Sequence, residues 1–213
     1  MQKSKHNHYM QFGCGYSSSH EGWINFDASP TLFLQRIPFL GFLTRRYVKP
    51  RFADDIIFGD ILRDLPIEKE SCKGIYCSHV LEHLSLEDFR IAIKKTYLYL
   101  ASNGIFRLVM PDINYLAQKY IMSTNPDASI EFLKESLLGV SKRERSALIF
   151  LRNCIGHSNH LWLWDFKSAK NELEKSGFNE IRNAHFGDSR DPKFNEIEDE
   201  SRWINCLGIE CQK

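Results

Sequence analysis

The sequence has no large excess of charge and no long apolar run. Its 28 Lys and Arg residues nearly balance its 27 Asp and Glu residues, which leaves a formal net charge of +1. Nucleic-acid-binding surfaces are usually strongly basic, so we expect no nucleic-acid partner and a small or neutral substrate. No uninterrupted apolar stretch reaches the roughly 18 to 20 residues of a membrane span. The polar start, MQKSKHNHY, lacks the apolar core of a signal peptide, and we expect a cytoplasmic protein.

The sequence has too few cysteines for a fold that depends on disulfide bonds. Six cysteines in 213 residues do not make a disulfide scaffold, and none belongs to a Cys-x-x-Cys pair, so we expect reduced thiols. Cys14 and Cys77 are expected to be small packing residues rather than nucleophiles. The length suits one domain with a sizeable core, and we expect a single domain over residues 1–213.

The most informative stretch is YMQFGCGYSSSHEGWINFD, residues 9–27. It predicts an apolar strand, a turn with Gly13 and Gly15, and a second strand that ends on Asp27. Glycine in such a turn lets the backbone approach a ligand closely, because it has no Cβ and tolerates positive φ. A carboxylate at the tip of the next parallel strand lies beside the turn, where it can accept hydrogen bonds from both hydroxyls of a ribose. This corner therefore suits a nucleotide-like ligand.

The same turn departs from the dinucleotide-binding fingerprint. Ser18 stands where that pattern has its third glycine, and Asp27 follows Gly15 much sooner than the usual spacing of about twenty residues. A parallel crossover normally needs about a dozen residues, so we expect a very short helix or none here. An oxidoreductase that uses a nicotinamide dinucleotide stays an alternative that the missing glycine disfavours.

Further along, apolar strands alternate with helical periodicity. We expect a strand at 56–58, a strand ending near Ser78, a helix over 86–100 that begins at Ser85 and stops at Asn103-Gly104, and a strand at 104–112. Helices are then expected over 113–122, through much of 127–159 and over 160–177, with a closing strand pair at 179–187 and 202–211. This pattern predicts an α/β fold with a Rossmann-like, doubly wound, mostly parallel seven-stranded sheet covered on both faces.

Three segments have open interpretations. Residues 31–52 contain a basic cluster at Arg45, Arg46, Lys49 and Arg51. This segment is expected to be a lid over the ligand corner, a patch that touches a membrane surface or partner, or an amphipathic helix packed on the sheet. We favour the packed helix over membrane contact. The basic run of Lys142, Arg143 and Arg145 is expected on a solvated helix face. The acidic stretch 188–201 is expected to be a surface loop rather than an acceptor or cation contact.

Asp60 follows the strand at 56–58. Because the carboxyl ends of strands face the ligand crevice in a doubly wound sheet, Asp60 can accept a hydrogen bond from the amino group of a base, and Ile61 can pack on its ring. Alternatively, Asp60 closes a turn.

In order and spacing, FGCG, NFD, GDIL, CSHVLEHL and GIFRLVMPD resemble the class I S-adenosylmethionine-dependent methyltransferases. The ending, with HLWLWD and RWINCLGIEC, resembles a bacterial methyltransferase-domain subgroup often associated with polysaccharide or other biosynthetic gene clusters. The resemblance implies a seven-stranded sheet with an antiparallel last strand, S-adenosyl-L-methionine as cofactor and a small-molecule or glycan acceptor. The cofactor residues that it implies are Gly13, Cys14 and Gly15 in the turn, Asp27 at the ribose, Asp60 and Ile61 at the adenine, and Ser78 and His79 beside the sulfonium.

Methyl transfer asks little of side chains, because the sulfonium already activates its methyl group. A base is needed only if the acceptor must lose a proton. His79 is the first candidate, since its unperturbed pKa is near neutral. His160 and Asp165 are further candidates, although either can instead make a helix-start contact. Trp162 and Trp164 are expected in the core or a pocket wall, and Tyr115 can line the acceptor pocket.

Two alternatives remain. His79-Val-Leu-Glu-His83 fits the H-x-x-E-H pattern of zinc peptidases, but that chemistry needs the motif within a helix and a third ligand. Because the first histidine follows a strand, we expect no metal site. A non-catalytic member of the methyltransferase fold, which binds a partner or scaffolds a complex, is also open because fold does not fix activity. The acceptor atom and the oligomeric state are left open.

Overall fold

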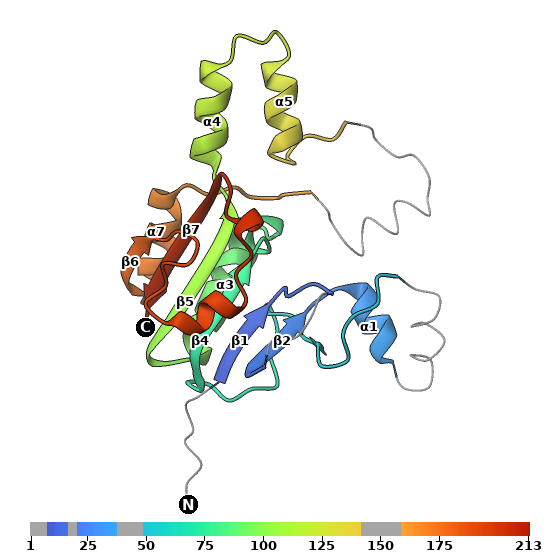
Figure 1. The fold of residues 1–213 in the computed structure, drawn as a ribbon, viewed down its shortest axis with the longest axis vertical. Helices are drawn as coiled ribbons and strands as arrows, with labels where there is room; N and C mark the ends of the chain where they lie inside the picture. Colours follow the sequence, from blue (N-terminus) through green and yellow to red (C-terminus); the bar gives the residue numbers. More distant parts are fainter. Residues whose placement is uncertain (1–7, 17–20, 38–48, 142–158) are drawn as a thin grey trace, which may run out of the picture.

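A seven-stranded sheet lies at the centre of the molecule (Figure 1). The structure is a computed structural model that describes residues 8–16, 21–37, 49–141 and 159–213. The strand order is β3-β2-β1-β4-β5-β7-β6, and β7 alone runs antiparallel to its neighbours. The predicted fold class, a mostly parallel doubly wound sheet with an antiparallel last strand, is confirmed. The strands are β1 (His8–Phe12), β2 (Trp23–Asp27), β3 (Ile57–Phe58), β4 (Cys72–Ser78), β5 (Leu100–Pro111), β6 (Asn179–Asn183) and β7 (Cys206–Gln212).

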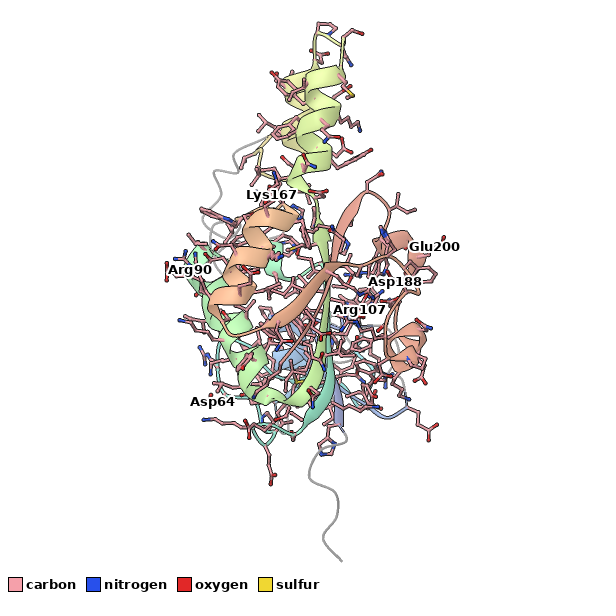
Figure 2. The ribbon with its side chains drawn as sticks, turned by 90° about the vertical axis from the view of Figure 1, so that its left-hand side faces the viewer. Asp64, Arg90, Arg107, Lys167, Asp188 and Glu200 are labelled. Carbon is pink, nitrogen blue, oxygen red and sulfur yellow. The ribbon has the colours of Figure 1, made fainter. Side chains whose placement is uncertain are left out.

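The helices and 3-10 turns follow the strands. They are α1 (Pro30–Arg36), η1 (Leu81–His83), α3 (Leu86–Tyr99), α4 (Ile113–Met122), α5 (Ala128–Glu135), α7 (Phe166–Lys175), η2 (Pro192–Glu196) and η3 (Glu200–Arg202). Helices α3 and α7 lie on one side of the sheet, and the β6–β7 connection, residues 184–205, lies on the other (Figure 2). Both faces are covered as predicted. The face under the β6–β7 connection is covered by a segment with the 3-10 turns η2 and η3 rather than by α-helices.

Strand periodicity divides the core into two layers, because successive side chains of a strand point to opposite faces. On β5, Phe106 and Leu108 belong to the main core with α3 and α7. Val109 instead packs with Phe194 and Trp203 of the β6–β7 connection in a second cluster. The connection thus buries apolar surface of its own, so the expectation that residues 188–201 form only a surface loop is wrong.

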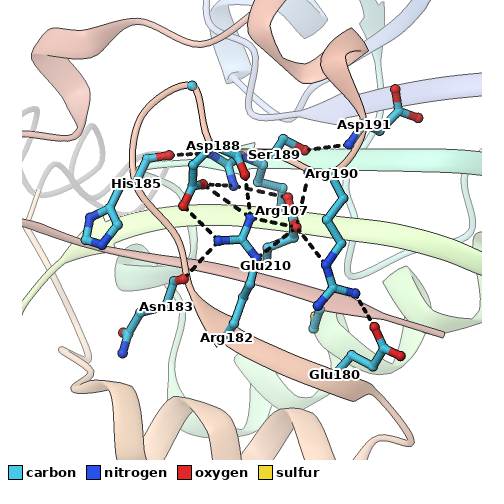
Figure 3. A network of polar contacts seen from close by, with 12 residues as sticks. Arg107, Glu180, Arg182, Asn183, His185, Asp188, Ser189, Arg190, Asp191 and Glu210 are labelled. Carbon is cyan, nitrogen blue, oxygen red and sulfur yellow. Dashed lines mark hydrogen bonds and ion pairs between the residues drawn. The ribbon is translucent and has the colours of Figure 1, made fainter.

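A buried arginine also holds the β6–β7 connection to the sheet (Figure 3). Arg107 is fully buried on β5, and its guanidinium pairs with Glu198, with Asp188 at 3.1 Å and with Glu210 at 3.1 Å. The ring of Trp203 lies 4.6 Å from the guanidinium carbon. Burial of a charge is tolerable only when it is paired, so these carboxylates fix the path of the connection over the sheet.

Several predicted boundaries shift. Helix α3 begins after Ser85 as predicted but ends at Tyr99, and Asn103-Gly104 lies inside β5 instead of ending the helix. The predicted helix over 160–177 begins only at Phe166, because the side chain of Asp165 accepts a hydrogen bond from the Ser168 backbone and starts α7 there. Within 127–159, α5 ends at Glu135. The basic run at 142–145 lies outside the described residues.

Helices α4 and α5 form a hairpin that projects from one end of the sheet (Figure 1). Lys119 and Glu135 join the two helices across 2.7 Å, and Ile121 and Met122 are exposed near the tip. Among the described residues, no helix combines the length and the apolar character needed to cross a membrane.

Part of the expected insert at 31–52 is helical. Leu32 of α1 packs with Phe52 and Ile56 in a small cluster beside β3. Residues 38–48, which include Arg45 and Arg46, lie outside the described part of the chain, whereas Arg51 is exposed. Whether the insert acts as a lid stays a prediction, as does the single-domain organisation.

Candidate active site

Four parallel strands end at the same edge of the sheet, and a cavity of about 610 Å³ opens there. Polar and glycine residues follow each strand, since β1 leads into the glycine turn, β2 ends on a carboxylate, and β3 and β4 are followed by Asp60 and His79. The cavity wall includes six of the eight predicted cofactor residues: Gly13, Gly15, Asp27, Asp60, Ile61 and His79. The remaining two, Cys14 and Ser78, line an adjoining cavity of about 300 Å³.

The two glycines of the turn have different surroundings, because Gly13 packs against Val80 and Gly15 has open space around it. Both have positive φ, +67° at Gly13 and +71° at Gly15, which favours glycine at each position. A Cβ built on Gly13 would lie 2.0 Å from Cγ2 of Val80, so this glycine lets the turn pack against the segment after β4. A Cβ on Gly15 would meet no atom within 4 Å. The backbone at Gly15 is therefore open to an approaching ligand.

Asp27 is held in place by the backbone around it. One carboxylate oxygen accepts a hydrogen bond from the Gly15 N–H at 2.9 Å, and the other accepts from the Ser29 N–H at 2.8 Å. A carboxylate has about four acceptor positions, so these two bonds orient the group and leave it able to accept from ligand hydroxyls. The described residues between β1 and β2 contain no helix, but residues 17–20 fall outside the described part, so the very short or absent helix stays a prediction.

Asp60 lies after β3 on the cavity wall and also closes a turn. Its Oδ1 atom accepts a hydrogen bond from the Leu62 N–H at 2.9 Å. Ile61 is buried in the main core while it contributes to the same wall. The turn contact and the predicted ligand contact are compatible, because the first uses only one of the carboxylate's oxygens.

Arg202 is a site residue that the sequence analysis missed. From η3 it lines both cavities, and it donates hydrogen bonds to Oγ of Ser78 at 2.9 Å and to the Ser78 carbonyl at 2.7 Å. No local signal marks it, because Ser78 is 124 positions earlier in the chain. Cys14 is partly buried, and burial, aided by the negative charge of Asp27, raises the pKa of its thiol to about 12. The Cys14 thiol is thus a poor nucleophile at neutral pH.

His79 follows β4 in the left-handed region, with φ +54°. Its Nε2 atom lies 2.9 Å from the Arg202 carbonyl, and its Nδ1 atom lies 3.3 Å from the Glu82 carboxylate. Burial lowers the pKa of His79, but its contacts with Cys206, Glu82 and the Arg202 carbonyl outweigh burial and raise that pKa to about 10. An imidazolium cannot accept a proton, so this environment works against the base role that stays a prediction for His79.

The further base candidates, His160 and Asp165, do not line either cavity. His160 is buried, with Nδ1 2.8 Å from the Ser136 carbonyl. Asp165 caps α7, and its hydrogen bonds from Ser168 lower the pKa of the carboxyl. The helix-start contact considered for Asp165 is therefore the one that it makes, whereas His160 precedes the helix by several residues.

The three aromatic residues expected in the core or near the acceptor lie in different environments. Trp164 is in the main core, where its ring stacks on Phe89 with centroids 4.1 Å apart. Trp162 is 42% exposed and so lies outside the core. Tyr115 is partly buried on α4, and its place in an acceptor pocket stays a prediction.

The H-x-x-E-H segment does not form one helical face. His79 lies at the end of β4, and only Leu81–His83 adopt a 3-10 turn. The placement within an α-helix that the zinc-peptidase pattern requires is thus not present at these residues.

Comparisons with known proteins bear on the fold. No protein-family model matches the chain, and no curated protein matches it. Among solved structures, one chain of the complex between the Haloferax volcanii Trm112 methyltransferase activator and a candidate methyltransferase matches with a TM-score of 0.51 at 14% identity, over 100% of this chain and 84% of that one. An S-adenosylmethionine-dependent methyltransferase from Thermotoga maritima matches with a TM-score of 0.51 at 14% identity, over 97% and 82%.

A candidate S-adenosylmethionine-dependent methyltransferase from Listeria monocytogenes matches with a TM-score of 0.50 at 16% identity, over 98% of this chain and 90% of that one. Other matched chains are longer, and this chain spans about half of their length. The fold of the chain is therefore the Rossmann-like fold found in solved structures named as S-adenosylmethionine-dependent methyltransferases.

Proposed function

We propose that this protein transfers the methyl group of S-adenosylmethionine to a small-molecule or glycan-type acceptor. One observation carries the proposal: the oriented carboxylate of Asp27 lies beside the open backbone of Gly15 on the wall of a cavity of about 610 Å³. That size falls within the range of ordinary ligand pockets, and its place at the carboxyl ends of parallel strands is where doubly wound folds bind nucleotides.

The residues of this edge fit an adenosyl group. Asp27 accepts hydrogen bonds from the ribose hydroxyls, using acceptor positions that Gly15 and Ser29 leave free. Asp60 accepts from the amino group of adenine, and Ile61 supplies an apolar surface for the base. These assignments combine the resemblance in the sequence with the positions of the side chains on the cavity wall.

Arg202 extends the site toward the second cavity. Its two hydrogen bonds to Ser78 leave other N–H groups of the guanidinium available, because arginine has five such donors. We assign it to the carboxylate of the methionine portion, since a guanidinium suits carboxylate geometry.

The reaction needs alignment and the exclusion of water more than acid–base chemistry. S-adenosylmethionine, when bound, supplies a methyl group that its sulfonium makes electrophilic. The walls of the crevice hold the acceptor lone pair in line with that group. An acceptor that already carries a free lone pair needs no base. The likeness of the C-terminal sequence to methyltransferase-domain proteins of polysaccharide gene clusters supports a glycan-type acceptor.

Titration calorimetry with S-adenosylhomocysteine tests the proposal. The wild-type protein should bind, and Asp27→Asn should weaken binding by about 10-fold to 100-fold, because a hydrogen bond to a charged group contributes about 1.5–3 kcal/mol. Asp127→Asn is the matched control, because this exposed carboxylate precedes α5 and makes no cap hydrogen bond. Release of S-adenosylhomocysteine from S-adenosylmethionine in the presence of sugar or small-molecule acceptors then tests turnover.

The outcomes separate the alternatives. Binding that Asp27→Asn leaves intact would remove the adenosyl site from this corner. A folded protein with no affinity for S-adenosylhomocysteine would favour a non-catalytic binding or scaffold role, and preferential binding of NAD would favour an oxidoreductase.

A further inference from the structure

Glu82, His83 and His160 bring three metal-ligating groups together behind the cavity wall. One ligand atom from each residue lies within 4.8 Å of the others. Glu82 and His83 come from η1, whereas His160 comes from the segment before α7. Glu82 is 1% exposed and His160 is 8% exposed, so two of the three groups are shielded from solvent.

The two histidines are oriented by main-chain carbonyls. Nδ1 of His160 lies 2.8 Å from the Ser136 carbonyl, and Nδ1 of His83 lies 3.2 Å from the Asn159 carbonyl. A carbonyl oxygen only accepts, so each Nδ1 is the donor, and Nε2 is left with its lone pair in the neutral ring. Histidines that bind metal are usually held in this way, with the second ring nitrogen donating to a carbonyl or carboxylate.

The carboxylate of Glu82 lacks the hydrogen bonds that a buried anion requires. Both of its oxygens are buried, and neither has a hydrogen-bond partner among the described residues. The Oε1 atom lies 3.3 Å from Nδ1 of His79 and 3.9 Å from Nε2 of His160. The His79 ring offsets part of the charge of this carboxylate, but neither carboxylate oxygen has a full hydrogen bond among the described residues. A cation between the carboxylate and the two imidazoles would complete the missing contacts of this buried group.

Backbone hydrogen bonds hold the two parts of the cluster together. The N–H groups of Leu161 and Trp162 both donate to the Glu82 carbonyl, at 2.8 Å and 3.1 Å, and the His160 N–H donates to the Leu137 carbonyl at 3.2 Å. The segment that carries His160 is thereby docked on η1. The three ligands are supported by main chain rather than by mobile side chains alone, as a metal site requires.

We propose that Glu82, His83 and His160 bind a divalent transition-metal ion, and that zinc is the ion that this donor set suits best. With zinc bonds of about 2.0–2.2 Å, the ligand atoms of a tetrahedral site are about 3.4 Å apart. Side-chain rotations that move each ligand atom by about 1 Å would therefore close the cluster around the ion. The H-x-x-E-H interpretation paired His79 with His83, whereas here the second histidine ligand comes from 77 residues further along the chain.

A zinc ion with three protein ligands keeps a fourth position for water or a substrate atom. His83 also lines the cavity of about 610 Å³, so an ion held here stands at its wall. We assign the fourth position to a heteroatom of the methyl acceptor, such as a hydroxyl oxygen. This assignment rests on the proposed function, whereas metal binding by the three side chains does not.

Cobalt and zinc titrations of the full chain test the site. After dialysis against a chelator, the protein should bind one equivalent of Co²⁺ with the visible absorption of a low-coordinate site, and Zn²⁺ should displace the Co²⁺. His83→Asn and His160→Asn should each weaken Zn²⁺ binding by at least 10-fold, and Glu82→Gln should do the same. His185→Asn is the matched control, because His185 is exposed on the β6–β7 connection and should leave binding unchanged.

Circular dichroism identifies any variant that does not fold. His83 is only partly buried, so His83→Asn keeps the comparison available if Glu82→Gln unfolds. Failure of the wild-type protein to take up Co²⁺ or Zn²⁺, or equal affinity in His83→Asn and His185→Asn, would overturn the proposal. S-adenosylhomocysteine binding is measured separately with metal-free protein, so failure of the metal site and failure of the cofactor site give different results.

Discussion

Replacement of Gly13 by alanine tests whether the glycine turn is shaped by its contact with the segment after β4. The added Cβ would lie 2.0 Å from Cγ2 of Val80 and 3.2 Å from its Cβ, at a backbone φ of +67°. Gly15 provides the matched control, because its φ is +71° and a Cβ there would meet nothing within 4 Å. The two substitutions therefore share the backbone strain and differ in the steric contact.

The size of the effect follows from these two contributions. A left-handed conformation costs an L-residue about 1–2 kcal/mol, and the lower entropy of the unfolded alanine chain offsets about 0.4–1 kcal/mol of that. Gly15→Ala should therefore lower the free energy of unfolding by about 1 kcal/mol. Overpacking adds about 1–3 kcal/mol, so Gly13→Ala should lower it by about 2–4 kcal/mol.

Urea denaturation of a double-mutant cycle with Val80→Ala measures the contact directly. Removal of the Val80 methyl groups makes room for the new Cβ, so Gly13→Ala should cost about 1–2 kcal/mol less in the Val80→Ala background than in the wild type. Gly15→Ala should cost the same in both backgrounds. S-adenosylhomocysteine affinity should fall with Gly13→Ala if the turn forms the proposed site.

Equal destabilisation by Gly13→Ala and Gly15→Ala, together with additivity of Gly13→Ala and Val80→Ala, would refute the reasoning. That result would mean that the turn can shift away from Val80 at no cost, and that Gly13 is needed only for its backbone conformation.

Three more predictions concern the framework of the site. Arg107→Met should lower the free energy of unfolding by about 3–5 kcal/mol, because it removes the ion-pair partner of the fully buried Glu198 carboxylate. Arg190→Met, whose side chain is 44% exposed, should cost less than about 1 kcal/mol, and urea denaturation measures both. The hydrogen bond from Arg90, with a second from Lys175, lowers the pKa of Glu172 to about 2. In thermal melts, the wild-type protein should therefore be more stable than Glu172→Gln by its full margin above about pH 4.5, and this margin should disappear as the pH falls toward 2. An advantage that grew on acidification would contradict this sign. Ser85→Ala should cost about 1 kcal/mol of unfolding free energy, because its hydroxyl accepts the first-turn N–H of α3; no loss would show that the cap is dispensable.

Local patterns were enough to predict the sheet and which residues meet at its edge, whereas cofactor binding by those residues stays a prediction. Apolar runs with turn residues between them predicted the strands, and the order of strand, glycine turn and Asp27 placed a carboxylate beside an open backbone. The prediction worked because parallel strands of a doubly wound sheet end at one edge, so residues that follow different strands meet without any further information. Boundaries were less secure, and Asn103-Gly104 failed as a helix stop because β5 begins at Leu100, directly after α3.

The surroundings of these residues depended on contacts between distant parts of the chain. Neither helix nor strand periodicity shows that Arg202 reaches Ser78, that His79 meets the Arg202 carbonyl and Glu82, or that His160 approaches Glu82. Residues 188–201 look like an acidic loop in sequence, and only the burial of Arg107 reveals why Asp188 and Glu198 turn their carboxylates toward the sheet. The sequence by itself determined the sheet and the residues at its edge, because these follow from local hydrogen bonding and apolar periodicity. The tertiary structure decided the charge environment and the potential metal ligands, because those depend on which distant segments pack together.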